Sequence, residues 1–120
     1  MSTFYRPLTL IGAAGEQVTI DALVDKGATF TSVPGQVLMD VGVEPRRQVS
    51  LSLAEGSSHM QELGYAQVEL ESIEGPTYVV FGTNGSPPAI GAVTLEGFLL
   101  GVEPVGQRLV PVEGWQANNA

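Results

Sequence analysis

The feature that most limits the fold of this chain is the period of its apolar residues. These residues fall mostly at alternate positions or in short runs punctuated by glycine, as over Val18–Ala22 and again over Val49–Leu53. A period of two places alternate side chains on one face of a β-strand, whereas an amphipathic helix needs a period of about 3.6. The sequence therefore predicts an all-β fold.

Turn residues divide this pattern into hairpins. Gly12 to Gly15 and the stretch Glu74-Gly75-Pro76 interrupt two of the apolar runs, so each is predicted to connect antiparallel strands. The first hairpin is expected to pair Tyr5–Ile11 with Gln17–Val24.

Two stretches depart from the strand period. Pro34–Val41 opens with proline and ends before a glycine, which predicts one marginal helical turn, and Ala92–Phe98 has the apolar spacing of a short helix. No linker or internal repeat is visible, so residues 1–120 are predicted to form a single domain, with the polar segment 116–120 as a frayed tail.

Composition excludes several kinds of site. The 120 residues include no cysteine and the single histidine His59, so a zinc knuckle, a thiolate nucleophile and a two-histidine metal site within one chain are excluded. No cofactor is expected. Thirteen acidic against five basic residues give a net charge of −8, which makes nucleic acid and anionic membranes poor partners. The first ten residues include Arg6 and Pro7 and read neither as a signal peptide nor as a spanning helix, so a cytoplasmic location is expected.

The segment that carries chemistry is the end of the second predicted strand. There a buried apolar run leads directly into Asp25, followed by Lys26 and Gly27. A carboxylate at the end of a buried strand loses hydration and must be paired, hydrogen-bonded or protonated, and such positions are often functional. The local pattern also fits a simpler role, in which Asp25 caps a turn and Gly27 supplies a positive φ.

Four motifs together resemble the retropepsin-like (retroviral-type) aspartic peptidases. Leu23-Val24-Asp25-Lys26-Gly27-Ala28-Thr29 resembles the family's active-site signature, which is two apolar residues followed by Asp-Thr-Gly-Ala-Thr/Ser, with lysine in place of threonine. Ala89-Ile90-Gly91, leading into the predicted helix, is similar to its second signature. Val49–Leu53, the turn Ala54-Glu55-Gly56-Ser57 and a strand returning from about Met60 resemble the flap hairpin, and Leu100–Pro104 with Arg108–Val112 resemble terminal strands of bacterial and transposon members.

The resemblance implies a fold, a partner and a mechanism. It implies a small closed or barrel-like fold with a flap hairpin and one short helix near Ala92–Phe98. The chain offers one catalytic motif, so a homodimer would bring two copies of Asp25 together, one acting as general base on a water and the other, protonated, donating to the scissile carbonyl. The substrate would be a peptide or protein segment, extended and largely apolar.

By the same resemblance, further residues are expected at the site. Lys26, Gly27, Ala28 and Thr29 would form the active-site loop with Asp25. A second set would bind substrate, from the pocket walls and the flap turn: Leu23, Ala54, Glu55, Gly56, Ser57, Ala89 and Ile90. The pocket positions Leu23, Ala89 and Ile90 fit plain core residues equally well. His59, just after the flap turn, could touch a ligand but is not expected to be catalytic.

Lys26 is the main departure from the family pattern. The usual threonine or serine hydroxyl donates and accepts across the dimer axis, whereas an ammonium has three donors and no acceptor. Two symmetry-related copies near the axis would repel, unless Lys26 extends into solvent, loses its proton or pairs with Asp25. Two alternatives therefore stay open: a catalytically inactive module of the same fold that binds peptides or dimerises, and an unrelated small β-barrel in which Asp25 is a turn residue.

The aromatic residues near the chain ends also bear on assembly. In the family, terminal strands commonly help form the sheet between subunits. Burial within one subunit is nevertheless the expectation for Tyr5 and Trp115.

Overall fold

Strands account for about half of the chain. The structure is a computed structural model and describes residues 3–116. Its elements, in chain order, are β1 (Tyr5–Ile11), β2 (Gln17–Val24), β3 (Thr31–Pro34), α1 (Gly35–Asp40), β4 (Arg47–Ser52), β5 (Ser58–Leu70), β6 (Ile73–Gly82), β7 (Ala89–Ile90), α2 (Ala92–Gly97), β8 (Leu100–Glu103) and β9 (Arg108–Pro111). The all-β prediction is confirmed, and both predicted helical stretches form short helices.

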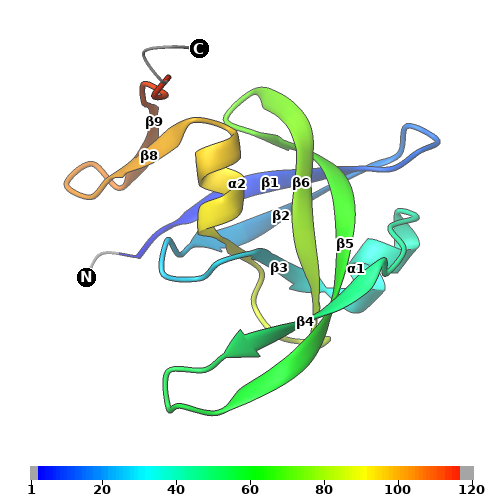
Figure 1. Ribbon diagram of the computed structural model, residues 1–120. Helices are drawn as coiled ribbons and strands as arrows, with labels where there is room; N and C mark the ends of the chain where they lie inside the picture. The colour runs from blue at the N-terminus through cyan, green and yellow to red at the C-terminus, as the bar shows by residue number, and fades with distance from the viewer. Residues whose placement is uncertain (1–2, 117–120) are drawn as a thin grey trace.

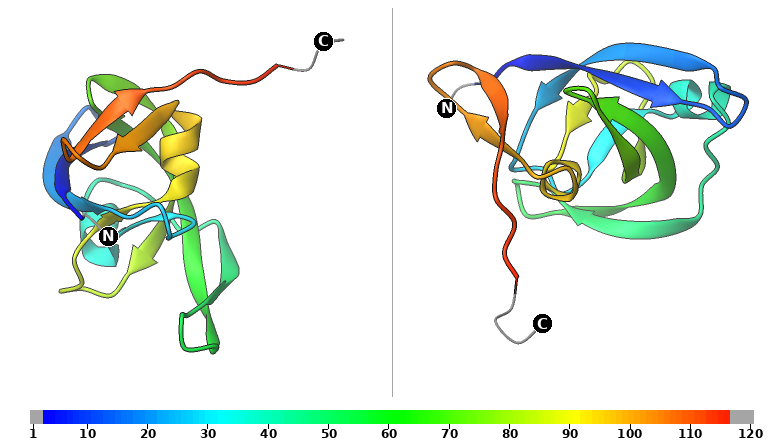
Figure 2. Two further views of the ribbon diagram at one scale, coloured as in Figure 1. Left: turned by 90° about the vertical axis from the view of Figure 1, so that its left-hand side faces the viewer. Right: turned by 90° about the horizontal axis from the view of Figure 1, so that it is seen from above.

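Seven of the strands form one sheet that closes on itself. Its order is β1-β2-β7-β3-β6-β5-β4, and an additional pairing of β1 with β5 completes the ring. Figure 1 and the right panel of Figure 2 show these strands surrounding the interior of the molecule. The strands β8 and β9 form a separate two-stranded sheet. The predicted closed, barrel-like architecture is therefore confirmed.

Two predicted hairpins have the expected strands. β1 and β2 have the predicted bounds, Tyr5–Ile11 and Gln17–Val24, and pair antiparallel from Tyr5↔Leu23 to Ile11↔Gln17. β4 pairs with β5 from Arg47↔Leu63 to Ser52↔Ser58, and their hairpin projects away from the ring (Figure 1). Because the flap-like hairpin is present, the unrelated barrel without one is set aside.

The predicted connection at Glu74-Gly75-Pro76 is wrong. The chain turns instead at Glu71 and Ser72, whose φ angles are 52° and 65°. Two consecutive positive φ angles give a two-residue hairpin turn that matches strand twist. Pro76 lies inside β6, opposite Gln67, where β6 pairs with β5 alone because its pairing with β3 begins only at Val79. A proline is tolerated in such a half-paired stretch.

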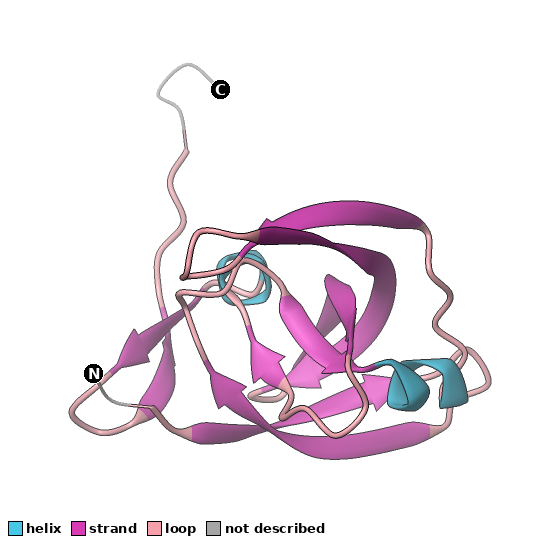
Figure 3. Cartoon of the chain, turned by 90° about the horizontal axis from the view of Figure 1, so that it is seen from below, coloured by secondary structure: helices cyan, strands magenta, loops and turns pink. Residues whose placement is uncertain are grey.

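The core fills the ring. Its fully buried large side chains include Leu8, Leu10, Leu38, Val33 and Leu70. The two helices lie well apart from each other, as Figure 3 shows, and α2 packs against β6 and β8. Within residues 3–116 no helix is long and apolar enough to cross a membrane.

The chain ends differ from expectation. Trp115 is fully exposed and Tyr5 is 57% exposed, so their predicted burial within one subunit is wrong. After β9 the backbone continues away from the ring without entering the sheet (Figure 2). The predicted frayed tail, apart from Gln116, lies outside the described residues.

Candidate active site

Asp25 is the first residue after β2 and is held by backbone groups on two sides. Its N–H donates to the Ile90 carbonyl oxygen at 2.9 Å, and its own carbonyl oxygen accepts from the Ala28 N–H at 3.1 Å. Its side-chain Oδ1 accepts a hydrogen bond from the Gly27 N–H at 3.0 Å. Asp25 as a whole residue is half-buried. The predicted cap is thus present, because Asp25 does cap the loop that follows it. The predicted positive φ at Gly27 is wrong, since Gly27 is not among the glycines that have a positive φ.

The loop that contains Asp25 is bound to the start of α2. The Ala92 N–H donates to the Ala28 carbonyl oxygen at 2.8 Å, and the Val93 N–H donates to the Thr29 carbonyl oxygen at 2.9 Å. Gly91 allows this approach, since a Cβ atom there would lie 2.5 Å from the carbonyl carbon of Phe30. The two predicted signatures, far apart in sequence, therefore form one structural unit.

A hollow of about 480 Å³ separates this loop from the β4–β5 hairpin. The loop side is formed by Gly27, Ala28, Thr29 and Phe30. The hairpin side is formed by Ser50, Leu51, Ser52, Leu53, His59 and Gln61. No Asp, Glu, Lys or Arg lines the hollow, so it suits uncharged side chains of a bound chain.

The predicted substrate-binding residues divide into three groups. Leu23 and Ala89 are neighbours in the parallel pairing of β2 with β7, and both are half-buried. Ile90 is fully buried in the core, so within this chain it supports Asp25 only through its carbonyl oxygen. The flap-turn residues Ala54, Glu55, Gly56 and Ser57 are all exposed at the tip of the hairpin and do not line the hollow.

The flap turn itself is well defined. Gly56 has a φ of 103°, and its N–H donates to the Leu53 carbonyl oxygen at 2.9 Å. The Leu53 N–H donates to the Ser57 carbonyl oxygen at 2.7 Å, and the Ser57 hydroxyl donates to the Glu55 carboxylate. The tip is thus a turn closed by its own hydrogen bonds.

Sequence reasoning missed the flap-strand residues that line the hollow. The motif drew attention to the turn, whereas Ser50, Leu51, Ser52 and Gln61 of the strands contribute to the wall of the hollow. His59, which pairs with Leu51, also lines it and lies 3.0 Å from the Gln61 amide nitrogen. The predicted pairing of the two flap strands on either side of the turn could have indicated these residues.

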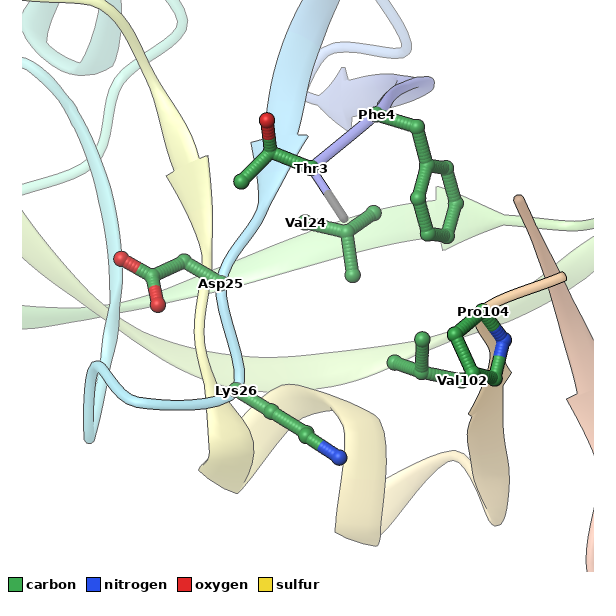
Figure 4. A pocket seen from close by; sticks show the side chains of 7 residues that line it. All are labelled: Thr3, Phe4, Val24, Asp25, Lys26, Val102 and Pro104. Carbon is green, nitrogen blue, oxygen red and sulfur yellow. The ribbon is translucent and has the colours of Figure 1, made fainter. Parts of the chain in front are cut away.

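Lys26 extends away from Asp25. The carboxylate and the ammonium point in different directions in Figure 4, and the lysine is exposed. Among residues 3–116 the ion pairs are Arg6–Glu71 and Arg108–Glu103, so the pairing of Lys26 with Asp25 in one chain does not form. Both residues line a second hollow of about 340 Å³, together with Thr3, Phe4, Val24, Val102 and Pro104.

Comparison with known proteins bears on the fold. No protein-family model matches the sequence. No curated protein matches it either. Among solved structures, the solution structure of simian foamy virus (mac) protease matches with a TM-score of 0.56 and 16% sequence identity, over 78% of this chain and 92% of that chain. The chain has a retropepsin-like fold.

The side chains of the described residues limit the chemistry of the site. No group of three or more His, Cys, Asp or Glu side chains that could hold a metal ion occurs in the part of the chain that the structure describes. The polar groups around the loop and the hollow are the Asp25 carboxylate, backbone amides, hydroxyl and amide side chains and the imidazole of His59. Such groups can perform general acid and base catalysis on a water molecule when two carboxylates share a proton.

Proposed function

We propose that this chain is an aspartic endopeptidase that acts as a homodimer, with Asp25 of each subunit as a catalytic residue. The observation that carries the proposal is the position of Asp25, at the start of a loop that is clamped by α2 and lies beside the hollow under the flap hairpin. The likeness of the fold to a viral protease supports it. Across a two-fold axis, the same loop of a second copy would supply the second carboxylate.

In this mechanism each part of the site has one task. One Asp25 takes a proton from a water molecule as it attacks the peptide carbonyl carbon, and the other, protonated, donates to the carbonyl oxygen. The flap turn, Ala54 to Ser57, closes over the substrate backbone and excludes water. Leu23 and Ala89 would contact substrate side chains beside Asp25. The neutral lining of the hollow favours an extended, largely apolar peptide.

A second candidate function rests on Lys26. An ammonium follows Asp25 where the family has a hydroxyl that accepts as well as donates, and two copies near the dimer axis repel. The alternative is therefore a catalytically inactive retropepsin-like module that binds peptides or dimerises. It keeps the hollow and the flap but lacks a competent pair of carboxylates.

Cleavage of an unfolded protein at mildly acidic pH separates the two candidates. The wild-type chain and Lys26→Thr would each be assayed beside their Asp25→Asn counterparts. We expect Lys26→Thr to cut at least about tenfold faster than wild type, because it restores the hydroxyl and removes two like charges from the axis. Asp25→Asn should abolish cleavage in both backgrounds.

The remaining outcomes are also decisive. Peptide binding by both chains without cleavage by either favours the inactive module. Cleavage that survives Asp25→Asn would show that Asp25 is not catalytic. If neither chain cuts or binds a peptide, the peptidase and the peptide-binding module are both wrong, and sedimentation then tests whether the chain is a dimerisation module alone.

A further inference from the structure

Three buried threonines from three different elements share one hydrogen-bonded cluster. The Thr31 hydroxyl of β3 lies 2.6 Å from the Thr94 hydroxyl of α2, which lies 2.7 Å from the Thr77 hydroxyl of β6. Thr31 and Thr94 are 0% exposed, and Thr77 is 8% exposed. The hydroxyl groups therefore satisfy one another away from solvent.

The cluster also reaches the backbone beside the active-site loop. The Gly91 N–H donates to the Thr31 hydroxyl oxygen at 3.1 Å. A chain of donors can therefore run from Gly91 through Thr31 and Thr94 to Thr77, and each bond in such a chain strengthens the next. Valine has the same shape as threonine and would fill these positions without a buried polar group, so the hydroxyl groups have a use beyond packing.

The stability of helix α2 depends on its contacts with neighbouring strands. It has six residues, and no side chain caps its N-terminus. A helix this short does not hold itself in place, because its nucleation is unfavourable and tertiary contacts must supply its stability. Thr94 is the α2 residue that bonds by its side chain to both β3 and β6.

The same helix clamps the Asp25 loop. Its first two residues, Ala92 and Val93, donate their N–H groups to the carbonyl oxygens of Ala28 and Thr29. A shift of α2 would therefore move the loop, and with it the carboxylate. Thr94 does not line the hollow under the flap, so it acts on the site only through other residues.

We propose that Thr94 is a positioning residue, whose hydroxyl fixes α2 against β3 and β6 and so orders the loop that presents Asp25. The ordering of the loop is a property of the fold, whereas its consequence for catalysis rests on the proposed function. The two parts are measured separately.

The first measurement is amide hydrogen exchange in Thr94→Val, which keeps the shape and removes both hydroxyl bonds. We expect exchange at the Ala92 and Val93 amides to rise about tenfold, since each of the two lost buried hydrogen bonds changes a local equilibrium by about threefold. The amides of Val43 and Arg46, which donate to Leu38 and Leu63 outside the cluster, serve as references and should change less than about twofold.

Matched variants separate positioning from general stability. Thr94→Ser retains the hydroxyl and should restore wild-type exchange at Ala92 and Val93. Thr19→Val, which breaks the exposed bond between the Thr9 and Thr19 hydroxyls, should leave these amides unchanged. Should Thr94→Val fail to fold, Thr77→Val decides the question: it removes one of the two bonds and should raise exchange at Ala92 and Val93 about threefold.

The second measurement is activity in the Lys26→Thr background. There Thr94→Val should lower kcat about tenfold with little change in KM, because the residue does not touch substrate, and Thr94→Ser should recover kcat. An equal rise in exchange at the test and reference amides, or none, would overturn the positioning role. If no variant cuts a peptide, the proposed function fails while the exchange result still decides the role of Thr94.

Discussion

Gly91 occupies a position that a larger residue cannot enter without moving the backbone. A Cβ atom there would lie 2.5 Å from both the carbonyl carbon and the carbonyl oxygen of Phe30, and 2.9 Å from the Phe30 nitrogen. Contacts this short involve backbone atoms, which cannot rotate away as a side chain can. The glycine of the second signature is thus required by the approach of α2 to the Asp25 loop.

Gly91→Ala should therefore destabilise the protein by about 3 kcal/mol, at the upper end of what overpacking costs. Gly97→Ala is the matched control, because a Cβ atom at Gly97, in the same helix, meets nothing within 4 Å. It should be neutral or slightly stabilising. Chemical denaturation of both variants measures the free energies of unfolding, and equal values for the two would contradict the argument.

Some residues of the candidate site could be predicted from the sequence and others could not. Asp25, Gly27 and Gly91 stand in recognisable motifs, and the structure brings them into one unit. Thr31 and Thr94 could not be singled out, since buried threonines look like ordinary strand and helix residues until the fold places them side by side. Their function depends on partners 63 positions away, which no local pattern specifies.

At the scale of elements, hairpins whose turns contain glycine could be predicted, whereas the hairpin whose turn lacks glycine could not. The glycine-rich turns before β2 and at the flap tip have residues that favour positive φ, and Gly15 and Gly56 do adopt it, at 90° and 103°. Glu71 and Ser72 adopt the same region without glycine, so the sequence drew attention to the glycine and proline inside β6 instead.

The β8–β9 hairpin should respond to pH through Glu103. Hydrogen bonds from the Gly106 and Val105 N–H groups and the nearby Arg108 lower the pKa of the Glu103 carboxyl, with the Gly106 bond as the largest cause. A pKa lowered by folding means that ionised Glu103 stabilises the hairpin above the ordinary glutamate value. This stabilisation is lost as the pH falls through the lowered pKa.

An NMR titration of the Val105 and Gly106 amides measures this effect. In the wild-type chain both amides should shift with a midpoint below the ordinary glutamate value of about 4.3. Glu103→Gln removes the carboxylate and should abolish the shift. A midpoint at or above the ordinary value would show that the turn does not depend on the ionised side chain.

At the scale of the whole molecule, the closure of the ring could not be predicted from local sequence patterns. β1 pairs with β5 through contacts such as Thr9↔Glu69, and β3 runs parallel to β6 across the molecule. Hydrophobic periodicity specifies which face of a strand is buried but not which distant strand it joins. The closed architecture was reachable from the sequence only because the motifs resembled a known family.

Lys26 should weaken the association of two copies of this chain. Asp25 and Lys26 lie together at the second hollow, and Lys26 is exposed there, so a dimer that joins two Asp25 loops also brings two ammonium groups toward one axis. The wild-type chain should consequently form a weak homodimer. Lys26→Thr should bind its partner about three- to tenfold more tightly at low salt, through lost repulsion and a hydroxyl that can donate and accept.

Controls must separate this local repulsion from the charge of the whole chain. The net charge of −8 already opposes association, and Lys26→Thr makes it more negative by one. Arg46→Thr has the same effect on net charge at an exposed position far from the Asp25 loop, so it should weaken the dimer slightly. Lys26→Met removes the charge without adding a hydroxyl and should fall between wild type and Lys26→Thr.

Sedimentation of these four chains across dilution and salt decides between the explanations. Salt screens repulsion over about 10 Å at 0.1 M, so it should strengthen the wild-type dimer more than the Lys26→Thr or Lys26→Met dimer. Because the uncharged variants carry the larger net charge, repulsion between whole chains would produce the opposite order. A wild-type dimer that is as tight as Lys26→Thr and indifferent to salt would mean that Lys26 points away from the axis, and Lys26 would then not explain any loss of activity.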